Sequence, residues 1–164
     1  MPIEFSFTVE GTHQGKFKGE SPKDKHKEQI VGLAFSYTVT LPFDISTGRG
    51  SGQRQHNPIT VTKEWGACTP QLFQALFTNE TLKEVHFDFR KTVGNDEGTL
   101  FHTVKLSNAR VVAIRQVTRS HEGSGGAQPE PAKYLEEISF TFERIEMENK
   151  PGKTAASDDW RHAE

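Results

Sequence analysis

The chain has 164 residues, with 20 basic and 22 acidic side chains and a formal net charge of −2. Its length suits one domain with its own core, and its balanced charge excludes a strong global field for nucleic acid or an anionic membrane. Hydrophobic residues make up 33% of the chain and include 12 phenylalanines, so the chain is polar for its size but able to form a packed core.

Targeting signals and cysteine usage restrict the class further. No apolar run approaches the ~20 residues that span a bilayer, and the N-terminus lacks the basic and apolar regions of a secretory signal. We therefore expect a protein made in the cytoplasm, which a dedicated machine must export if it leaves the cell. The one cysteine, Cys68, excludes an intramolecular disulfide and a cysteine-rich zinc site.

Alternating apolar and polar residues predict β-strands over most of the chain. The first covers residues 3–9, and the clearest covers 31–41, where apolar residues occupy odd positions until Pro42 removes a ladder donor. Further strands are predicted at 57–65, 85–89, 100–106, 111–114 and 138–147, with turns at 94–98 and at Ser107-Asn108. In the last strand the apolar residues move from even to odd positions, which indicates a bulge where the strand bends.

One helix is predicted between the strands at 57–65 and 85–89. Thr69 is a good N-cap, Pro70 suits the first helical position, and Asn79 marks the end. The apolar side chains form one stripe on this helix of about ten residues; they are Leu72, Phe73, Leu76 and Phe77. We interpret the stripe as core packing against a sheet, because a helix this short needs tertiary contacts to be stable.

Two polar loops interrupt the strands. Residues 42–57 contain three glycines, two serines and a threonine, which cannot build a packed element. A connection of roughly 15 residues is long for a hairpin, and such loops are usually functional or disordered. The sequence therefore leaves open a flexible hairpin tip and an arm that docks on another subunit. The composition of residues 120–131 predicts a second flexible loop, and the interrupted basic run at 16–27 indicates a solvated loop rather than a phosphate-binding patch.

The side chains that could carry chemistry form no catalytic or metal-binding pattern. None of the seven histidines has a metal-ligand spacing, and only a cross-strand pair of His86 and His102 is conceivable. Cys68 precedes a helix N-terminus, a position that can lower a thiol pKa, but no histidine partner is identifiable, which favours a buried structural thiol. The glycine-rich stretch 48–52 lacks the lysine of a phosphate-binding loop. We therefore predict no enzyme, no cofactor and no metal site.

Regular short strands with turn signals predict a mainly β fold. The expected architecture is an antiparallel β-barrel or two packed sheets, with one short α-helix and a long extended loop. Residues 1–150 are expected to form a single domain. A polar C-terminal tail is expected at 151–164, where Trp160 lies among charged residues.

Short motifs follow one another in order from one end of the chain to the other. They are Val9-Glu10-Gly11, the segment 25–30 before the strand at 31–41, Ser51-Gly52-Gln53-Arg54 with His56 and Pro58, Thr69-Pro70 with Leu72 and Leu76, Phe89-Arg90-Lys91, the strand at 138–147, and Ser157-Asp158-Asp159-Trp160-Arg161. Their order and spacing resemble the Hcp family, the tube-forming protein of bacterial type VI secretion systems, which is itself similar to phage tail-tube proteins.

The resemblance implies a β-barrel subunit that assembles into hexameric rings. Such rings stack head-to-tail into a hollow tube that shelters effector proteins in its lumen, and the subunits are themselves exported to the extracellular space or a target cell. The implied partners are further copies of the chain and the spike, sheath and effector proteins of the machine, with neither nucleic acid nor membrane insertion. Which residues line the lumen cannot be assigned from the sequence.

The long loop and the tail are expected to make the subunit contacts. The candidate interface residues are Phe43, Gly48, Gln53, Arg54, His56, Pro58 and Trp160. The alternative is a monomeric β-barrel ligand-binding module, with the loops 47–57 and 120–131 as its rim and with Trp65 or Trp160 at its pocket. The oligomeric state separates these two hypotheses.

Overall fold

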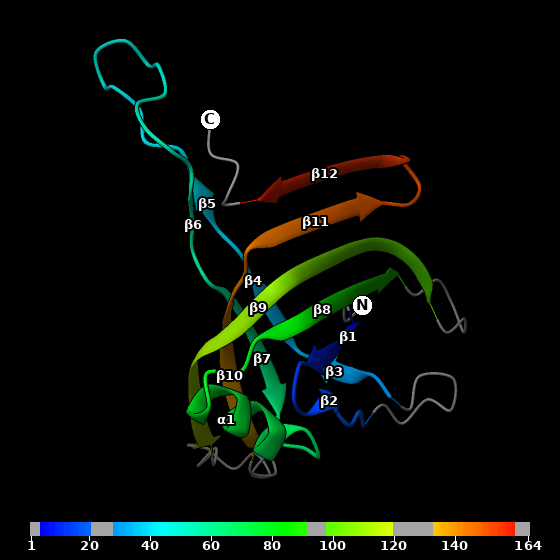
Figure 1. The fold of residues 1–164 in the computed structure, drawn as a ribbon. Helices are drawn as coiled ribbons and strands as arrows, with labels where there is room; N and C mark the ends of the chain where they lie inside the picture. Colours follow the sequence, from blue (N-terminus) through cyan, green and yellow to red (C-terminus); the bar gives the residue numbers. More distant parts are fainter. Residues whose placement is uncertain (1–3, 21–27, 92–97, 120–132, 160–164) are drawn as a thin grey trace, which may run out of the picture.

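Figure 1 shows, in a computed structural model, a body of antiparallel strands with one helix at its lower end and a long hairpin projecting from its upper end. The structure describes residues 4–20, 28–91, 98–119 and 133–159. The elements are β1 (Glu4–Gly11), β2 (Gly15–Lys16), β3 (Ile30–Gly32), β4 (Ala34–Ser36), β5 (Val39–Thr40), β6 (Gln55–His56), β7 (Ile59–Glu64), α1 (Thr69–Phe77), β8 (Leu82–Lys91), β9 (Thr99–Arg119), β10 (Lys133–Thr141), β11 (Arg144–Asn149) and β12 (Thr154–Asp159).

The strands form two antiparallel layers that share β9. Among the described residues, the hydrogen-bonded order is β2-β1-β8-β9-β10-β7-β4, an open path rather than a closed barrel. The first half of β9 pairs with β8 and β11, and its second half pairs with β10. In addition, β3 pairs with β1 and β12 with β11. The mainly β prediction is therefore confirmed, in its form of two packed sheets with one short helix.

Phenylalanine rings fill the space between the two layers. Phe87 of β8 lies with its ring centroid 5.2 Å from that of Phe35 on β4 and 6.5 Å from that of Phe140 on β10. Phe5 of β1 is also close to Phe35, at 6.1 Å. Each fully buried ring contributes roughly 1.5–3 kcal/mol by leaving water. The apolar residues that alternate along the strands therefore hold the two sheets together.

The clearest predicted strand, 31–41, is not one strand. The structure divides this stretch among β3, β4 and β5, which pair with β1, β7 and β6 respectively. A Cβ at Gly32 would lie 2.2 Å from the Phe5 ring, so only glycine lets the chain pass this ring where it leaves β1 for β7. The prediction was wrong because a period of two continues across the change of partner strand, and periodicity carries no information about partners.

The predicted turn at Ser107-Asn108 is also absent, and β9 runs through it as one strand of 21 residues. Asn108 has a φ of 50°, a left-handed conformation that asparagine tolerates better than most residues. The residue that the sequence marks as a turn therefore gives a local irregularity within a strand. It lies close to the point where β9 passes from one layer to the other.

The helix forms where it was predicted, but two details differ. Cys68 occupies the N-cap without a side-chain hydrogen bond, and Thr69 is the first helical residue. Of the predicted stripe, Leu72 is buried, whereas Phe77 is 74% exposed. Ala75, which the sequence analysis did not include, is buried in its place. The helix therefore contacts the core through Leu72, Ala75 and Leu76, and Phe77 lies outside this contact.

The C-terminal segment is more ordered than the predicted tail. Residues Thr154–Asp159 form β12, paired with β11 along its whole length. Composition missed this strand because an edge strand can be held by backbone hydrogen bonds without apolar side chains. The predicted single strand 138–147 is divided, because β10 ends at Thr141 and β11 begins at Arg144. The irregularity expected within it is present as a register shift against β9 between Ser139 and Phe140. The loop 120–131, nearly all of the turn 94–98, and Trp160 lie outside the described residues.

Candidate functional site

The long polar loop of the sequence is a hairpin, residues 39–56, which we call the arm. Its base is the two-stranded sheet of β5 and β6, and an isolated bridge joins Phe43 to Gly50 farther out. The arm projects beyond the body at the end opposite α1 (Figure 1). The structure therefore shows an extended hairpin with its own backbone pairing, and whether it docks on another subunit stays a prediction.

Local hydrogen bonds shape the tip of the arm. The Asp44 carboxylate accepts bonds from the Ser46 backbone N–H at 2.9 Å and from the Ser46 hydroxyl at 2.7 Å, and the Gly48 N–H donates to the Asp44 carbonyl at 2.7 Å. The Ser46 hydroxyl bond is the main reason that the pKa of Asp44 is lowered. Gly48 has a φ of 70°, which a glycine adopts without strain.

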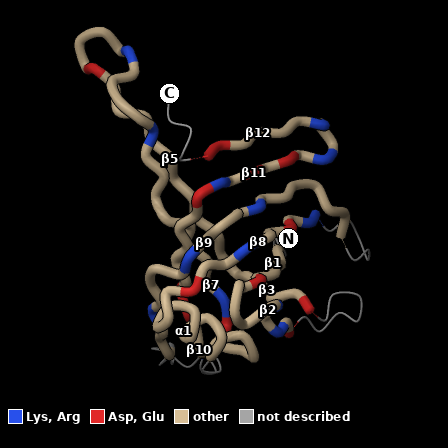
Figure 2. The backbone as a smooth tube through the Cα atoms, in the orientation of Figure 1, with Lys and Arg blue, Asp and Glu red and all other residues tan. Residues whose placement is uncertain are grey.

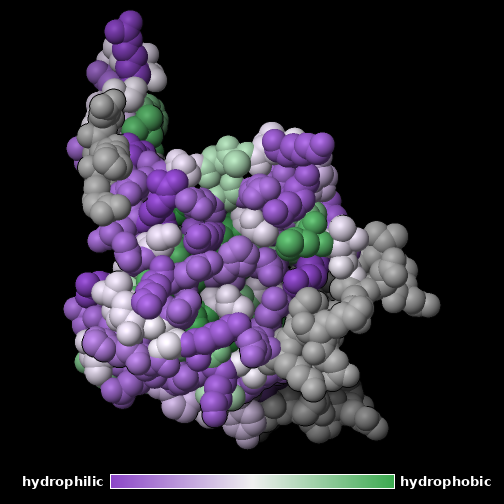
Figure 3. Space-filling view, turned by 45° about the vertical axis from the view of Figure 1, so that its right-hand side comes forward, coloured by the Kyte–Doolittle hydropathy of each residue, from purple (hydrophilic) through white to green (hydrophobic). Residues whose placement is uncertain are grey.

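One side of the arm is apolar and open to solvent. Val39, Leu41, Phe43 and Ile45 occupy alternate positions with exposed fractions of 48%, 56%, 63% and 92%. Figure 3 shows hydrophobic side chains on the arm, above a body whose visible face is mainly hydrophilic. A row of exposed apolar side chains on a projecting hairpin is typical of an interaction surface, and for this arm that role stays a prediction.

The root of the arm is fastened to the last strand of the body. The Arg54 guanidinium donates from two nitrogens to the Asp158 carboxylate of β12, and His56 Nε2 lies 2.6 Å from the same group. His56 Nδ1 lies 2.6 Å from the Tyr37 hydroxyl on the opposite side. The Arg54 hydrogen bond, followed by that of His56, holds the pKa of Asp158 below its ordinary value.

The predicted interface residues separate into two groups. Phe43, Gly48 and Gln53 are exposed on the arm, and Pro58 is exposed just past it. Arg54 and His56 instead turn toward the body, where Asp158 binds both. Whether any of them contacts a neighbouring subunit stays a prediction. Reasoning from the sequence missed Val39, Leu41 and Ile45 as exposed residues, although their alternation was the available signal.

The interior contains an ion pair that the sequence analysis did not predict. Lys63 and Glu136 have side chains only 2% and 0% exposed, and the Lys63 ammonium contacts the Glu136 carboxylate. The Thr69 hydroxyl at the start of α1 donates to the same carboxylate at 2.6 Å. Next to this pair, burial raises the pKa of the Cys68 thiol to about 11. The expectation of a buried structural thiol is therefore confirmed.

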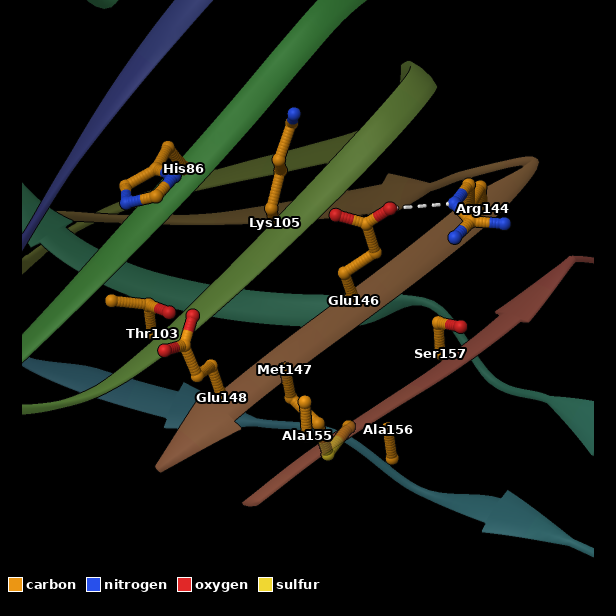
Figure 4. A pocket seen from close by; sticks show the side chains of 10 residues that line it. All are labelled: His86, Thr103, Lys105, Arg144, Glu146, Met147, Glu148, Ala155, Ala156 and Ser157. Atoms are coloured by element: carbon orange, nitrogen blue, oxygen red, sulfur yellow. Dashed lines mark hydrogen bonds and ion pairs between the residues drawn. The ribbon is translucent and has the colours of Figure 1, made fainter. Parts of the chain in front are cut away.

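A hollow of about 380 Å³ lies on the outer face of β8, β9, β11 and β12 (Figure 4). His86, Lys105 and Glu146 form a row across its neighbouring strands, and Arg144 pairs with Glu146 at 2.7 Å. Basic and acidic groups thus alternate in this hollow, which disfavours it as a phosphate or metal site. Neither Trp65 nor a residue of 47–57 lines it, unlike the pocket that the ligand-binding alternative requires.

The histidines on the strands do not come together. His86 is opposite Lys105 on β9, whereas His102 is opposite Phe89. His86 bonds instead to Asp88 at 2.8 Å, which is the largest cause of its raised pKa. Within the described ranges, no group of three histidine, cysteine or acidic side chains could hold a metal ion.

Charges of both signs are spread over the body without a single-sign field (Figure 2). In the part of the chain that the structure describes, no helix is long and apolar enough to cross a membrane. The fold and the arm together define a small two-sheet β-protein whose distinguishing feature is a projecting hairpin with an exposed apolar side.

Comparison with known proteins agrees with this class. Residues 7–148 match the family model for the type VI secretion system effector Hcp, and the chain belongs to this family of secretion tube proteins. The chain is 28% identical to the "Major exported protein" of Pseudomonas aeruginosa, over 94% of this chain and 93% of the relative.

Solved structures show the same fold. A crystal structure of an Hcp protein has a TM-score of 0.84 at 25% identity, covering 96% of this chain and 99% of that one. Hcp1 of the E. coli EAEC 042 pathovar has a TM-score of 0.81 at 26% identity, with the same coverage. The secreted protein Hcp3 of Pseudomonas aeruginosa has a TM-score of 0.76 at 23% identity, covering 97% and 99%.

Proposed function

We propose that this chain is a structural subunit of the inner tube of a type VI secretion system. Six copies form a ring, rings stack head-to-tail, and the arm of one subunit docks on a subunit of the next ring. Family membership and the exposed apolar side of the arm support this proposal. The arm carries the argument, because a monomer gains nothing from holding Phe43 and Ile45 away from its own core.

The energetics favour a repeated contact. Burying an apolar side chain of this size contributes roughly 1.5–3 kcal/mol. For a single arm, the entropy lost on association offsets most of this gain. When six arms act between two rings, each arm after the first contributes most of its contact free energy to stacking, because its docking is effectively intramolecular. A contact between different surfaces on the two partners generates open stacks from closed rings, and an arm on one end of the subunit provides that asymmetry.

The same proposal assigns the protein a passive role in export. The rings carry or shelter effector proteins in the lumen, contact the spike and sheath, and leave the cell with them. The name of the relative from Pseudomonas aeruginosa supports export. We assign no catalytic step to the chain, and we treat residues 1–150 together with β12 as one domain.

Light scattering during size-exclusion chromatography and negative-stain microscopy test the proposal. We expect a mass of six 18.4 kDa chains, or multiples of it, and ring-shaped particles. Phe43→Ser/Ile45→Ser removes the apolar contact from the arm and should leave rings while reducing stacks. Thr47→Ser, at the exposed tip of the same arm, is the matched control.

Two results would overturn the proposal. A clean monomer at high concentration would favour the monomeric ligand-binding alternative. Stacks that persist undiminished in Phe43→Ser/Ile45→Ser would show that the arm does not connect the rings.

A further inference from the structure

Two motifs that are distant in the sequence meet at the root of the arm. Arg54 and His56 leave the arm and bind Asp158 of β12, across separations of 104 and 102 residues. The Arg54 guanidinium also donates to the Asp159 carbonyl at 3.2 Å. The contact therefore joins the arm to β12, a strand whose described pairing partner is β11 and not β5 or β6.

The chemistry of this contact fixes which atom of His56 donates to Asp158. The Asp158 carboxylate only accepts hydrogen bonds when ionised, so His56 must donate from Nε2. His56 Nδ1 then accepts from the Tyr37 hydroxyl when the ring is neutral, and donates to it when the ring is protonated. Two guanidinium nitrogens on one carboxylate make a charge-assisted contact with a defined orientation. His56 is only 4% exposed, which removes competition from water.

Both sides of the hairpin are held, and not only the side that carries Arg54. The rings of Tyr37 and His56 stack with their centroids 6.1 Å apart and their planes 11° apart. Phe142, at the break between β10 and β11, meets both rings edge-on at 6.0 and 5.4 Å. The arm cannot swing about its root without breaking the ion pair or moving a ring off Phe142.

We propose that Arg54, His56 and Asp158 form a clamp that fixes the direction in which the arm leaves the body. Asp158 is the positioning residue, since its carboxylate is the group that both side chains of the arm share. A fixed direction presents the apolar side of the arm to its partner already oriented, so docking loses less conformational entropy. This consequence for docking rests on the proposed function, but the clamp itself does not.

The distance between two spin labels, measured by pulsed electron paramagnetic resonance, reports the direction of the arm. The labels are attached to Thr47→Cys at the tip and Lys83→Cys on β8, both exposed positions. Cys68 stays unlabelled because its thiol is buried and its pKa is about 11. The measurement uses the Phe43→Ser/Ile45→Ser background, so that docking cannot hold the arm, and dilution with unlabelled protein removes distances between subunits.

We expect a narrow distance distribution with the clamp intact and a broad one in Asp158→Asn and in Arg54→Met. Glu148→Gln is the control. It removes an exposed ion pair between Glu148 and Lys150 on β11, the strand next to β12, and leaves the arm unchanged. Hydrogen exchange of the Asn57 backbone N–H, which donates to the Thr38 carbonyl, should be roughly tenfold faster in the two clamp variants. This is the change expected when about 1.4 kcal/mol of local stability is lost.

Narrow distributions in both clamp variants would overturn the inference. So would faster amide exchange confined to β12, because the contact would then serve only to hold the last strand. With Phe43 and Ile45 restored, Asp158→Asn should also form fewer stacks. If broad distributions accompany a wild-type chain that never stacks, the proposed function fails while the clamp stands.

Discussion

Lys63 and Glu136 are two opposite charges that have almost no contact with water. Their removal from solvent costs free energy that their attraction and four further hydrogen bonds offset. Lys63 donates to the Glu64 carbonyl at 2.7 Å and to the Thr69 hydroxyl at 3.5 Å, and the Glu136 carboxylate accepts from Thr69 and Gln116. Since the Thr69 hydroxyl also accepts from the Gly66 N–H at 2.9 Å, the network joins the start of α1 to the sheet. A buried pair of this kind fixes a position more than it adds stability.

Breaking one side of this pair should be costly. We predict that Lys63→Met lowers the free energy of unfolding by about 3–5 kcal/mol, because the Glu136 carboxylate is left buried without its cation. Lys63→Met/Glu136→Leu should recover most of that loss. Lys83→Met, at an exposed lysine of β8, is the control and should change the value by less than about 0.5 kcal/mol. Urea unfolding at several protein concentrations measures all three, and a double variant as unstable as the single one would contradict the interpretation.

At the level of single residues, the sequence predicted the core better than the contacts of charged groups. Phe5 and Phe87 lie on strands in which apolar and polar residues alternate, and both are buried, as this pattern predicts. Lys63 occupies the same row as Ile59 and Val61, so alternation placed it toward the core. Its partner Glu136 is 73 positions away, and no local pattern connects the two. The same limitation applies to Asp158 and the arm, because their meeting depends on how the sheets are assembled.

At the level of elements, Asn108 gives β9 a left-handed residue where the strand passes between the two layers. A β-branched side chain is strained in that conformation. We predict that Asn108→Val costs about 1–2 kcal/mol of stability, while Asn108→Gly costs less, although both lose the bond from the Asn108 amide to Glu143. Chemical denaturation compares the two variants, and equal losses would show that the hydrogen bond, rather than the backbone conformation, is what matters there.

Strand positions were predictable, but strand partners were not. The strands β1, β7 and β8 appear where alternation predicted them, because each keeps one partner strand along its whole length: β8 for β1, β10 for β7 and β9 for β8. The stretch 31–41 and β9 change partners midway: the first was predicted as one strand and is three, and the second was predicted as two strands and is one. The predicted strand 138–147 is likewise divided into β10 and β11. Gly32 lies at one change of partner in 31–41, and Asn108 lies at the change in β9. In both, the residue was informative about backbone conformation but not about whether the chain ends a strand or redirects it.

At the level of the whole molecule, one side of the arm is apolar and the body carries mixed charges, in a chain whose net charge is −2. Contacts between rings through the arm should therefore respond to salt as hydrophobic contacts do. We predict that stacking persists when NaCl is raised to about 0.5 M, where the Debye length falls to roughly 4 Å. Sulfate should increase it, because this ion strengthens the burial of apolar surface.

Sedimentation velocity distinguishes single rings from stacks across both salt series. Phe43→Ser/Ile45→Ser should lose the response to sulfate, since the apolar side of its arm is no longer there to be buried, whereas Thr47→Ser should keep it. If NaCl disperses the stacks, ion pairs between rings dominate, and the charged outer face of β8, β9 and β11 becomes the surface that joins them. The two salts therefore decide which part of this polar molecule holds the tube together.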